Sequence, residues 1–228
     1  MVGDILEKQQ DELQLVIFDM DGLLVDTEHV YNDGWLYALN YFDVLIPNDL
    51  VKKWASYGLP QINDELIRYT GSHAITQLII ETREKYFLNQ LYAGKVDIKP
   101  YARNILIETR KKFYVGLASS TLKKRGIEIL EVLDLLKYID CPVFGDEVKN
   151  LKPEPDVYLK VLAKTGINPI NAIAVEDSIT GTIAAEKAHL ATILVPDSSF
   201  PELIKEIPKN VVNVGKDLSI LFEVYEKM

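Results

Sequence analysis

The chain has 228 residues, of which 48% are hydrophobic and 26% are charged, and this composition excludes a disordered or fibrous protein. Its 25 basic and 34 acidic residues give a net charge of −9, so a nucleic-acid partner is not expected. No apolar run approaches the roughly 18 residues that cross a bilayer, and the only cysteine, Cys141, cannot form an internal disulfide. We therefore expect a cytoplasmic globular protein that acts without nucleic acid or membrane.

Short apolar runs that end in polar turns predict strands, and the longer stretches between them predict helices. The predicted strands are residues 13–18, 113–118, 138–144, 172–175 and 191–195. The predicted helices are residues 102–112, 123–136, 155–165 and 181–188. Unbroken apolar strands that alternate with helices are typical of buried parallel sheets, so we expect an α/β fold with a doubly wound parallel sheet.

One interval does not follow this alternation. Residues 28–96 contain helical patterns and both tryptophans, with expected loops at residues 46–48, 57–60 and 71–72. We interpret this interval as an α-helical insertion between the first two strands. The expected domains are then a core of residues 1–27 and 97–228 and an inserted helical domain of residues 28–96.

Two carboxylates end the first predicted strand, in the sequence Asp19-Met20-Asp21-Gly22. Residues two apart in an extended segment point to the same side, so both carboxylates are expected to project beyond the strand ends. Close carboxylates repel each other, and burial increases that cost, so a cation or a shared proton is expected between them. Taken alone, the motif is weak, because Asp-Gly is also a common turn.

Other polar residues follow later predicted strands. Ser119 and Ser120 follow the second, Lys152 precedes a predicted helix, and Glu176 and Asp177 end the fourth. Parallel strand ends share one edge of a sheet, so these residues converge on one site. Each also has a plain structural explanation: residues 119–121 or the two acidic residues could cap the following helix, and Lys152 could lie on the surface.

Together these residues favour phosphoryl chemistry. The carboxylates of Asp19, Asp177 and Glu176 offer the hard oxygen ligands that Mg²⁺ prefers. No histidine or cysteine spacing in the sequence favours a softer metal. A lysine, a serine hydroxyl and the backbone N–H groups after Ser119 could hold a phosphoryl group.

The sequence from Asp19 to Glu28, together with Ser119, Lys152-Pro153 and Glu176-Asp177, resembles the four motifs of the haloacid dehalogenase superfamily. The resemblance covers about residues 13 to 200 and is closest to the subgroup that contains β-phosphoglucomutase and small phospho-sugar phosphatases. It implies a Rossmann-like core with an inserted α-helical cap domain.

The resemblance also implies a role for each motif residue. Asp19 would be the nucleophile that forms an aspartyl-phosphate, and Asp21 would be the acid/base, with its backbone carbonyl on Mg²⁺. Ser119, Ser120 and Lys152 would bind the transferring phosphoryl group. The metal ligands would be Asp19, Asp21, Glu176 and Asp177. Because dehalogenases of the superfamily lack an equivalent of Asp21, its presence favours phosphoryl chemistry.

The cap leaves the reaction open. The mutase has a histidine and a phosphate-binding arginine where this chain has Tyr31 and Gln61, and glutamine supplies no charge for a second phosphate. We therefore favour a Mg²⁺-dependent phosphatase, expected to be monomeric, acting on a small phosphorylated metabolite such as a phospho-sugar. The alternatives are a sugar-phosphate mutase and, more remotely, a non-enzymatic phospho-switch. Candidate substrate-binding residues in the cap are Tyr31, Tyr57, Gln61, Asn63 and Arg68.

Overall fold

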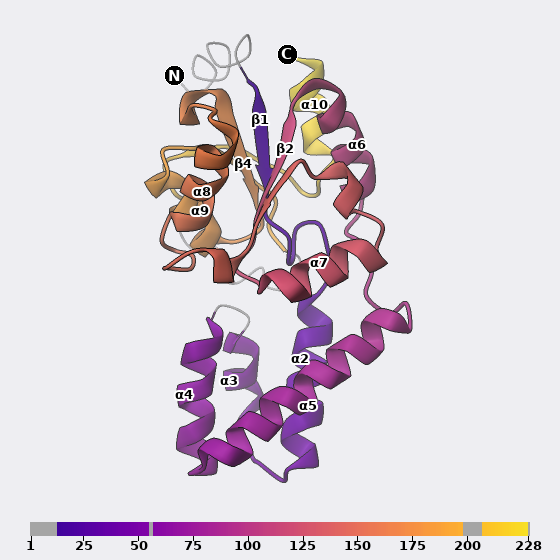
Figure 1. The fold of residues 1–228 in the computed structure, drawn as a ribbon, viewed down its shortest axis with the longest axis vertical. Coiled ribbons are helices and arrows are strands. Elements are labelled where there is room, and N and C mark those ends of the chain that lie inside the picture. Colours follow the sequence, from indigo (N-terminus) through magenta and orange to yellow (C-terminus); the bar gives the residue numbers. More distant parts are fainter. Residues whose placement is uncertain (1–12, 55–56, 198–206, 228) are drawn as a thin grey trace. The chain divides into compact units, whose positions relative to one another are not determined.

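The computed structural model describes residues 13–54, 57–197 and 207–227. The chain divides into two compact units, one formed by residues 1–25 and 98–228 and the other by residues 26–97 (Figure 1). The sequence analysis placed these boundaries at residues 27/28 and 96/97. The two connections between the units run side by side, because the Asp26 N–H donates to the Asp97 carbonyl at 2.9 Å and Val25 pairs with Ile98.

The larger unit contains a six-stranded sheet in the order β3-β2-β1-β4-β5-β6, in which all neighbours are parallel. The strands are β1 (Leu15–Phe18), β2 (Tyr114–Ala118), β3 (Cys141–Val143), β4 (Ala172–Glu176), β5 (Ala191–Leu194) and β6 (Val211–Val214). The expected α/β parallel fold is confirmed. The last strand, β6, was not predicted from the sequence, and its residues are half-buried or exposed rather than forming an apolar run.

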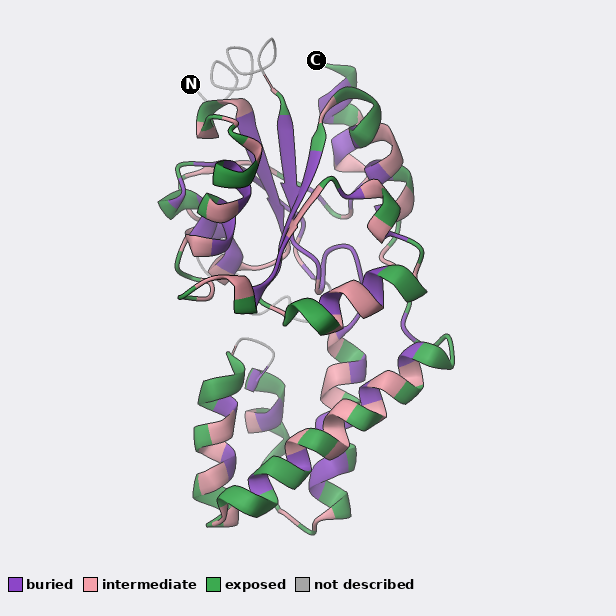
Figure 2. Cartoon of the chain, in the orientation of Figure 1, coloured by how far each residue is buried: buried purple, intermediate pink, exposed green. Residues whose placement is uncertain are grey.

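Helices lie on both sides of this sheet. They are α6 (Ala102–Lys112), α7 (Lys123–Val132), α8 (Asp156–Thr165), α9 (Ile179–Lys187) and α10 (Ile220–Glu226), with 3₁₀ turns η2 (Leu136–Tyr138), η3 (Gly145–Glu147) and η4 (Pro169–Asn171). Figure 1 shows α8 and α9 on one side and α6 and α10 on the other. The central strands β1 and β4 are buried along their whole length (Figure 2), which is why they are apolar without alternation.

Two of the predicted helices differ from the structure by more than one residue at one end. The helix expected at 123–136 ends at Val132, because the chain turns at Asp134 with φ +55° and continues as η2. The helix expected at 181–188 begins at Ile179, because the Ser178 side chain accepts a hydrogen bond from the Gly181 N–H at 3.1 Å. Ser178 is therefore the helix cap, and the capping explanation for Glu176 and Asp177 was wrong.

The smaller unit is helical, with α2 (Glu28–Tyr41), α3 (Asn48–Lys53), α4 (Leu59–Thr70) and α5 (His73–Tyr92). Its buried centre includes Trp35 and Trp54, whose rings meet edge to face at 5.2 Å between centroids. The loop expected at residues 57–60 is shorter than predicted, since α4 begins at Leu59 with Pro60 in its first turn. None of the helices in the described parts of the chain is long and apolar enough to cross a membrane.

Candidate active site

Asp19 lies at the carboxyl end of β1, between the neighbouring strands β2 and β4. In the sheet, Phe18 pairs with Leu117 of β2 and Val175 of β4, so the residue after each of these positions reaches the same edge. The Asp19 N–H continues the ladder by donating to the Val175 carbonyl at 3.0 Å. Its side chain is 11% exposed, so this carboxyl group is nearly buried at the sheet edge.

A tight turn after Asp19 redirects the chain. The Gly22 N–H donates to the Val25 carbonyl at 2.9 Å, and Gly22 has φ +81°, a conformation that glycine adopts without a Cβ clash. An added Cβ at Gly22 would lie 2.1 Å from Asp177 Oδ2. Glycine therefore serves two needs here, the turn and the close approach of a carboxylate.

Asp21, at the start of this turn, is held by hydroxyl groups from the segment after β2. Thr121 Oγ1 donates to Asp21 Oδ2 at 2.8 Å, and Ser119 Oγ lies 3.5 Å from the same oxygen. The Thr121 N–H in turn donates to Ser119 Oγ at 3.0 Å. The sequence analysis considered Thr121 only as part of a helix cap. That explanation was wrong, because α7 begins after Leu122 without a side-chain cap.

Ser120, which stands between Ser119 and Thr121 in the sequence, is exposed. An added Cβ at Gly145 would lie 2.3 Å from the Ser120 carbonyl oxygen, so it is the backbone of Ser120 that packs against its neighbours. Its expected role in phosphate binding stays a prediction.

Lys152 joins two carboxylates. Its Nζ donates to Asp19 Oδ1 at 2.5 Å and to Glu176 Oε1 at 2.6 Å, and its side chain is only 7% exposed. The explanation of Lys152 as a surface residue was therefore wrong. Glu176 is fully buried, and its Oε1 also accepts a hydrogen bond from the Tyr158 hydroxyl. The sequence analysis did not single out Tyr158, because a tyrosine within a predicted helix is usually an ordinary core residue.

Burial and charge act in opposite directions in this cluster. Burial raises the pKa of Asp19 to about 8, with Glu176 and Asp21 adding to the rise and Lys152 opposing it. Burial alone favours the neutral amine of Lys152, but the Asp19 and Glu176 carboxylates outweigh it and raise the lysine pKa. Lys152 is therefore a buried cation held between two acids.

Comparison with known proteins identifies the family. The family model of the haloacid dehalogenase-like hydrolases matches residues 16–195. The chain belongs to this family. The phosphorylated carbohydrates phosphatase of Thermotoga maritima is 32% identical over 186 residues, which are 79% of this chain and 84% of that protein. Hexitol phosphatase B of Escherichia coli is 29% identical over 203 residues, 81% of this chain and 84% of that protein.

Solved structures agree with this assignment. A candidate β-phosphoglucomutase of Thermotoga maritima superimposes with a TM-score of 0.75 at 28% identity, covering 95% of this chain and all of that one. The expected superfamily is thus confirmed. The expected class of enzyme, a phosphatase of the haloacid dehalogenase type, is supported by both the family and the named relatives.

The acidic residues of this haloacid dehalogenase-type site suit a divalent cation. Asp19, Glu176 and Asp177 each offer a carboxylate oxygen, and these oxygens lie within 4.8 Å of one another. Glu176 Oε2 is buried and accepts no hydrogen bond from the described residues, which leaves it available as a ligand. Such an all-oxygen donor set fits Mg²⁺. The Asp21 carboxyl group is not in this cluster, and its backbone carbonyl stays a predicted ligand.

The five candidate substrate residues all lie in the smaller unit, and their roles stay predictions. Tyr31 stacks on Phe87 with 4.5 Å between ring centroids, and the Arg83 guanidinium lies 4.1 Å from the Tyr31 ring. Arg83 is a nearly buried cation that the sequence analysis did not single out. The others are half-buried or exposed: Tyr57, Gln61, Asn63 and Arg68.

Proposed function

We propose that this enzyme is a Mg²⁺-dependent phosphatase that hydrolyses a small phosphorylated metabolite through an aspartyl-phosphate intermediate. The observation that carries the proposal is the contact of Asp19 with Lys152 beside the Asp19, Glu176 and Asp177 carboxylate cluster. A nucleophile, a cation and a ligand set for a metal are the parts that phosphoryl transfer needs. The names of the relatives, which include phosphatases of carbohydrates and hexitols, support a phospho-sugar or similar monophosphate as substrate.

In the first step of this proposal, an Asp19 carboxylate oxygen attacks phosphorus and the ester P–O bond breaks. Lys152 and a bound divalent cation would favour this ionised form of Asp19, against the rise in its pKa that burial causes. Asp21 gives its proton to the leaving oxygen, and the alcohol departs. Lys152 keeps its charge beside Asp19, where negative charge gathers on the phosphoryl oxygens, and Ser119 offers a further donor. A bound Mg²⁺, held by Asp19, Asp177, Glu176 and the Asp21 carbonyl, would neutralise part of that charge.

In the second step, the Asp21 carboxylate takes a proton from water as the water oxygen attacks phosphorus. The bond between phosphorus and the Asp19 oxygen breaks, which releases inorganic phosphate and restores both aspartates. The hydroxyl of Thr121, 2.8 Å from Asp21, would keep the acid/base oriented. Residues 28–96, which form the proposed helical cap, would carry the residues that select the substrate.

A conservative substitution tests the nucleophile. Asp19→Asn should abolish phosphate release from p-nitrophenyl phosphate in the presence of Mg²⁺, because the amide is not nucleophilic. Asp134→Asn makes the same change at an exposed aspartate, which is bonded to Arg103 and Lys137, and should leave turnover unchanged. Full activity of Asp19→Asn would refute the proposed mechanism.

The two alternatives predict different products. A mutase would interconvert glucose 1-phosphate isomers faster than it released phosphate, whereas a phosphatase releases phosphate without isomerisation. The position of Gln61, where the mutase has an arginine, favours hydrolysis. A phospho-switch would keep Asp19 phosphorylated for hours, whereas an enzyme would lose the phosphoryl group in seconds or less.

A further inference from the structure

One side chain outside the four motifs contacts both partners in the Glu176–Lys152 pair. Tyr158 lies in the first turn of α8 and is fully buried. Its hydroxyl donates to Glu176 Oε1, the oxygen that also accepts from Lys152 Nζ, and the Lys152 Nζ lies 5.1 Å from the centre of the Tyr158 ring. The hydroxyl and one face of the Tyr158 ring therefore both lie toward the charged cluster.

We propose that Tyr158 is a positioning residue for phosphoryl transfer: through Glu176 it holds Lys152 against the nucleophile Asp19. This inference rests on the proposed function. The Tyr158 hydroxyl bonds to Glu176 and its ring lies beneath the Lys152 ammonium, so Tyr158 acts on Asp19 through these two neighbours. Tyr158 follows the Lys152-Pro153 motif by five residues and is not one of the motif residues that the resemblance assigns a role.

The bonds of Lys152 explain why its position matters. An ammonium group has three donors, and two of them are used on Asp19 Oδ1 and Glu176 Oε1. The third N–H of Lys152 points to a phosphoryl oxygen only if the hydrogen bonds to Asp19 and Glu176 hold the ammonium group in one orientation. Because Glu176 sets one of those directions, a rotation of its carboxylate would turn the lysine away from the reacting centre.

Glu176 is itself fixed from two sides. An added Cβ at Gly181 would lie 2.1 Å from its carboxyl atoms, so the group packs closely on the backbone of α9. On the other side, the Tyr158 hydroxyl bonds to Oε1. Oε2 accepts no hydrogen bond within the described parts of the chain, which leaves it for a metal ion. Without Tyr158, only Lys152 itself would hold Oε1, and the pair could turn together.

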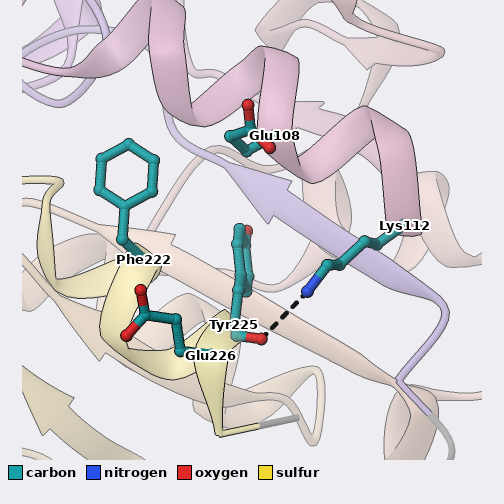
Figure 3. A pocket seen from close by; sticks show the side chains of 5 residues that line it. All are labelled: Glu108, Lys112, Phe222, Tyr225 and Glu226. Carbon is teal, nitrogen blue, oxygen red and sulfur yellow. Dashed lines mark hydrogen bonds between the residues drawn. The ribbon is translucent and has the colours of Figure 1, made fainter.

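The test compares two buried tyrosine hydroxyls. Tyr158→Phe removes the bond to Glu176 and keeps the ring, while Tyr225→Phe removes a 2.6 Å bond between two hydroxyls, Tyr225 and Thr109. Tyr225 belongs to α10 and lines a cavity of about 230 Å³ that includes none of the candidate site residues (Figure 3). Each variant loses one buried hydrogen bond, and because the bond of Tyr158 is made to a carboxylate, Tyr158→Phe should lose somewhat more thermal stability than Tyr225→Phe.

Turnover should separate the two variants. With p-nitrophenyl phosphate and Mg²⁺, Tyr158→Phe should lower kcat about tenfold or more, since a small misplacement of a catalytic group has effects of that order. Its KM should change less than about twofold if the lysine acts mainly on the transition state. Tyr225→Phe should keep both parameters. Wild-type kcat in folded Tyr158→Phe, or an equal loss of kcat in Tyr225→Phe, would overturn the positioning role.

A second variant displaces Glu176 from the opposite side. Gly181→Ala should favour helix α9 by its intrinsic propensity, yet its Cβ must push the Glu176 carboxylate away. We expect kcat to fall about tenfold, and thermal stability to fall as well, because the added methyl group overpacks a buried contact. In the double variant with Tyr158→Phe, the fall in kcat should be smaller than the product of the two single effects. If the fall in kcat of the double variant instead equalled the product of the two single effects, Gly181 and Tyr158 would act independently, which would contradict the proposal.

The same measurements keep this inference apart from the proposed function. If wild-type protein releases phosphate and Asp19→Asn does not, the function stands whatever Tyr158→Phe does. If Asp19→Asn remains active, the proposed mechanism fails, and a kcat effect of Tyr158→Phe would then have to arise elsewhere.

Discussion

Replacing Gly22 with alanine should weaken metal activation far more than it weakens the fold. Gly22 has φ +81°, and an alanine Cβ at this position would lie 2.1 Å from Asp177 Oδ2. The substitution therefore adds backbone strain and, separately, an overlap with a carboxylate that is a candidate Mg²⁺ ligand.

The two effects have different magnitudes. A non-glycine residue in the left-handed region costs about 1–2 kcal/mol, which corresponds to a decrease of about 2–8 °C in the melting temperature of a protein of this size. The carboxylate must also move by more than roughly 1 Å to reach an ordinary contact distance. Metal ligands tolerate displacements of only about 0.2 Å. We therefore expect the Mg²⁺ concentration for half-maximal activity to rise about 10- to 100-fold.

Gly166 provides the matched control, because it has φ +70° at the end of α8 and an added Cβ would meet nothing within 4 Å. Gly166→Ala carries the backbone strain without the overlap, so its loss of thermal stability should be no greater than that of Gly22→Ala, and its Mg²⁺ titration of phosphatase activity should be unchanged. The link from Gly22 through Asp177 to the metal would be refuted if Gly22→Ala needed the same Mg²⁺ concentration for half-maximal activity as the wild type. It would also be refuted if this concentration rose equally in both alanine variants.

Two further substitutions probe the charge and the hydroxyl of the site. Lys152→Met leaves the buried carboxylates of Asp19 and Glu176 without their cation, so kcat should fall about 10²- to 10³-fold and the fold should lose about 3–5 kcal/mol. Thermal unfolding should show that Mg²⁺ stabilises Lys152→Met more than the wild type, and equal stabilisation would contradict this. Thr121→Val removes the 2.8 Å bond to Asp21; kcat should fall about three- to tenfold with an unchanged Mg²⁺ titration, because the Asp21 carboxyl group is outside the carboxylate cluster. An unchanged kcat would show that Thr121 does not orient Asp21.

The meeting of the Asp19 and Glu176 carboxylates could be predicted because strand topology alone brings them together. Asp19 follows β1 and Glu176 ends β4, and these strands are neighbours in register, so any parallel sheet in this order places the two carboxylates at one edge. Apolar runs in the sequence reveal such strands. The weaker pattern of β6, half-buried and exposed, carries no such signal and was missed.

The hydroxyl partners could not be predicted in the same way. Thr121 and Tyr158 bond to Asp21 and Glu176 through side-chain directions that depend on the packing of α7 and α8, not on where a strand ends. From the sequence alone, Thr121 is expected to cap a helix and Tyr158 to be an aromatic residue of the hydrophobic core. Only the three-dimensional structure distinguishes a buried hydroxyl that bonds to the site from one such as Tyr225, which bonds to Thr109.

The choice of a hydroxyl beside Glu176 follows from the charge balance of the cluster. Asp19, Glu176 and Asp177 bring three carboxylates together, and Lys152 supplies one cation, so the group has negative charge left for a divalent ion to neutralise. A second basic residue at position 158 would satisfy Glu176 but would also compete with that ion. A phenol donates a hydrogen bond without adding charge, and burial raises the pKa of Tyr158 well above its ordinary value, which keeps it a donor. Tyr158 can therefore fix Glu176 and leave the electrostatic demand for Mg²⁺ intact.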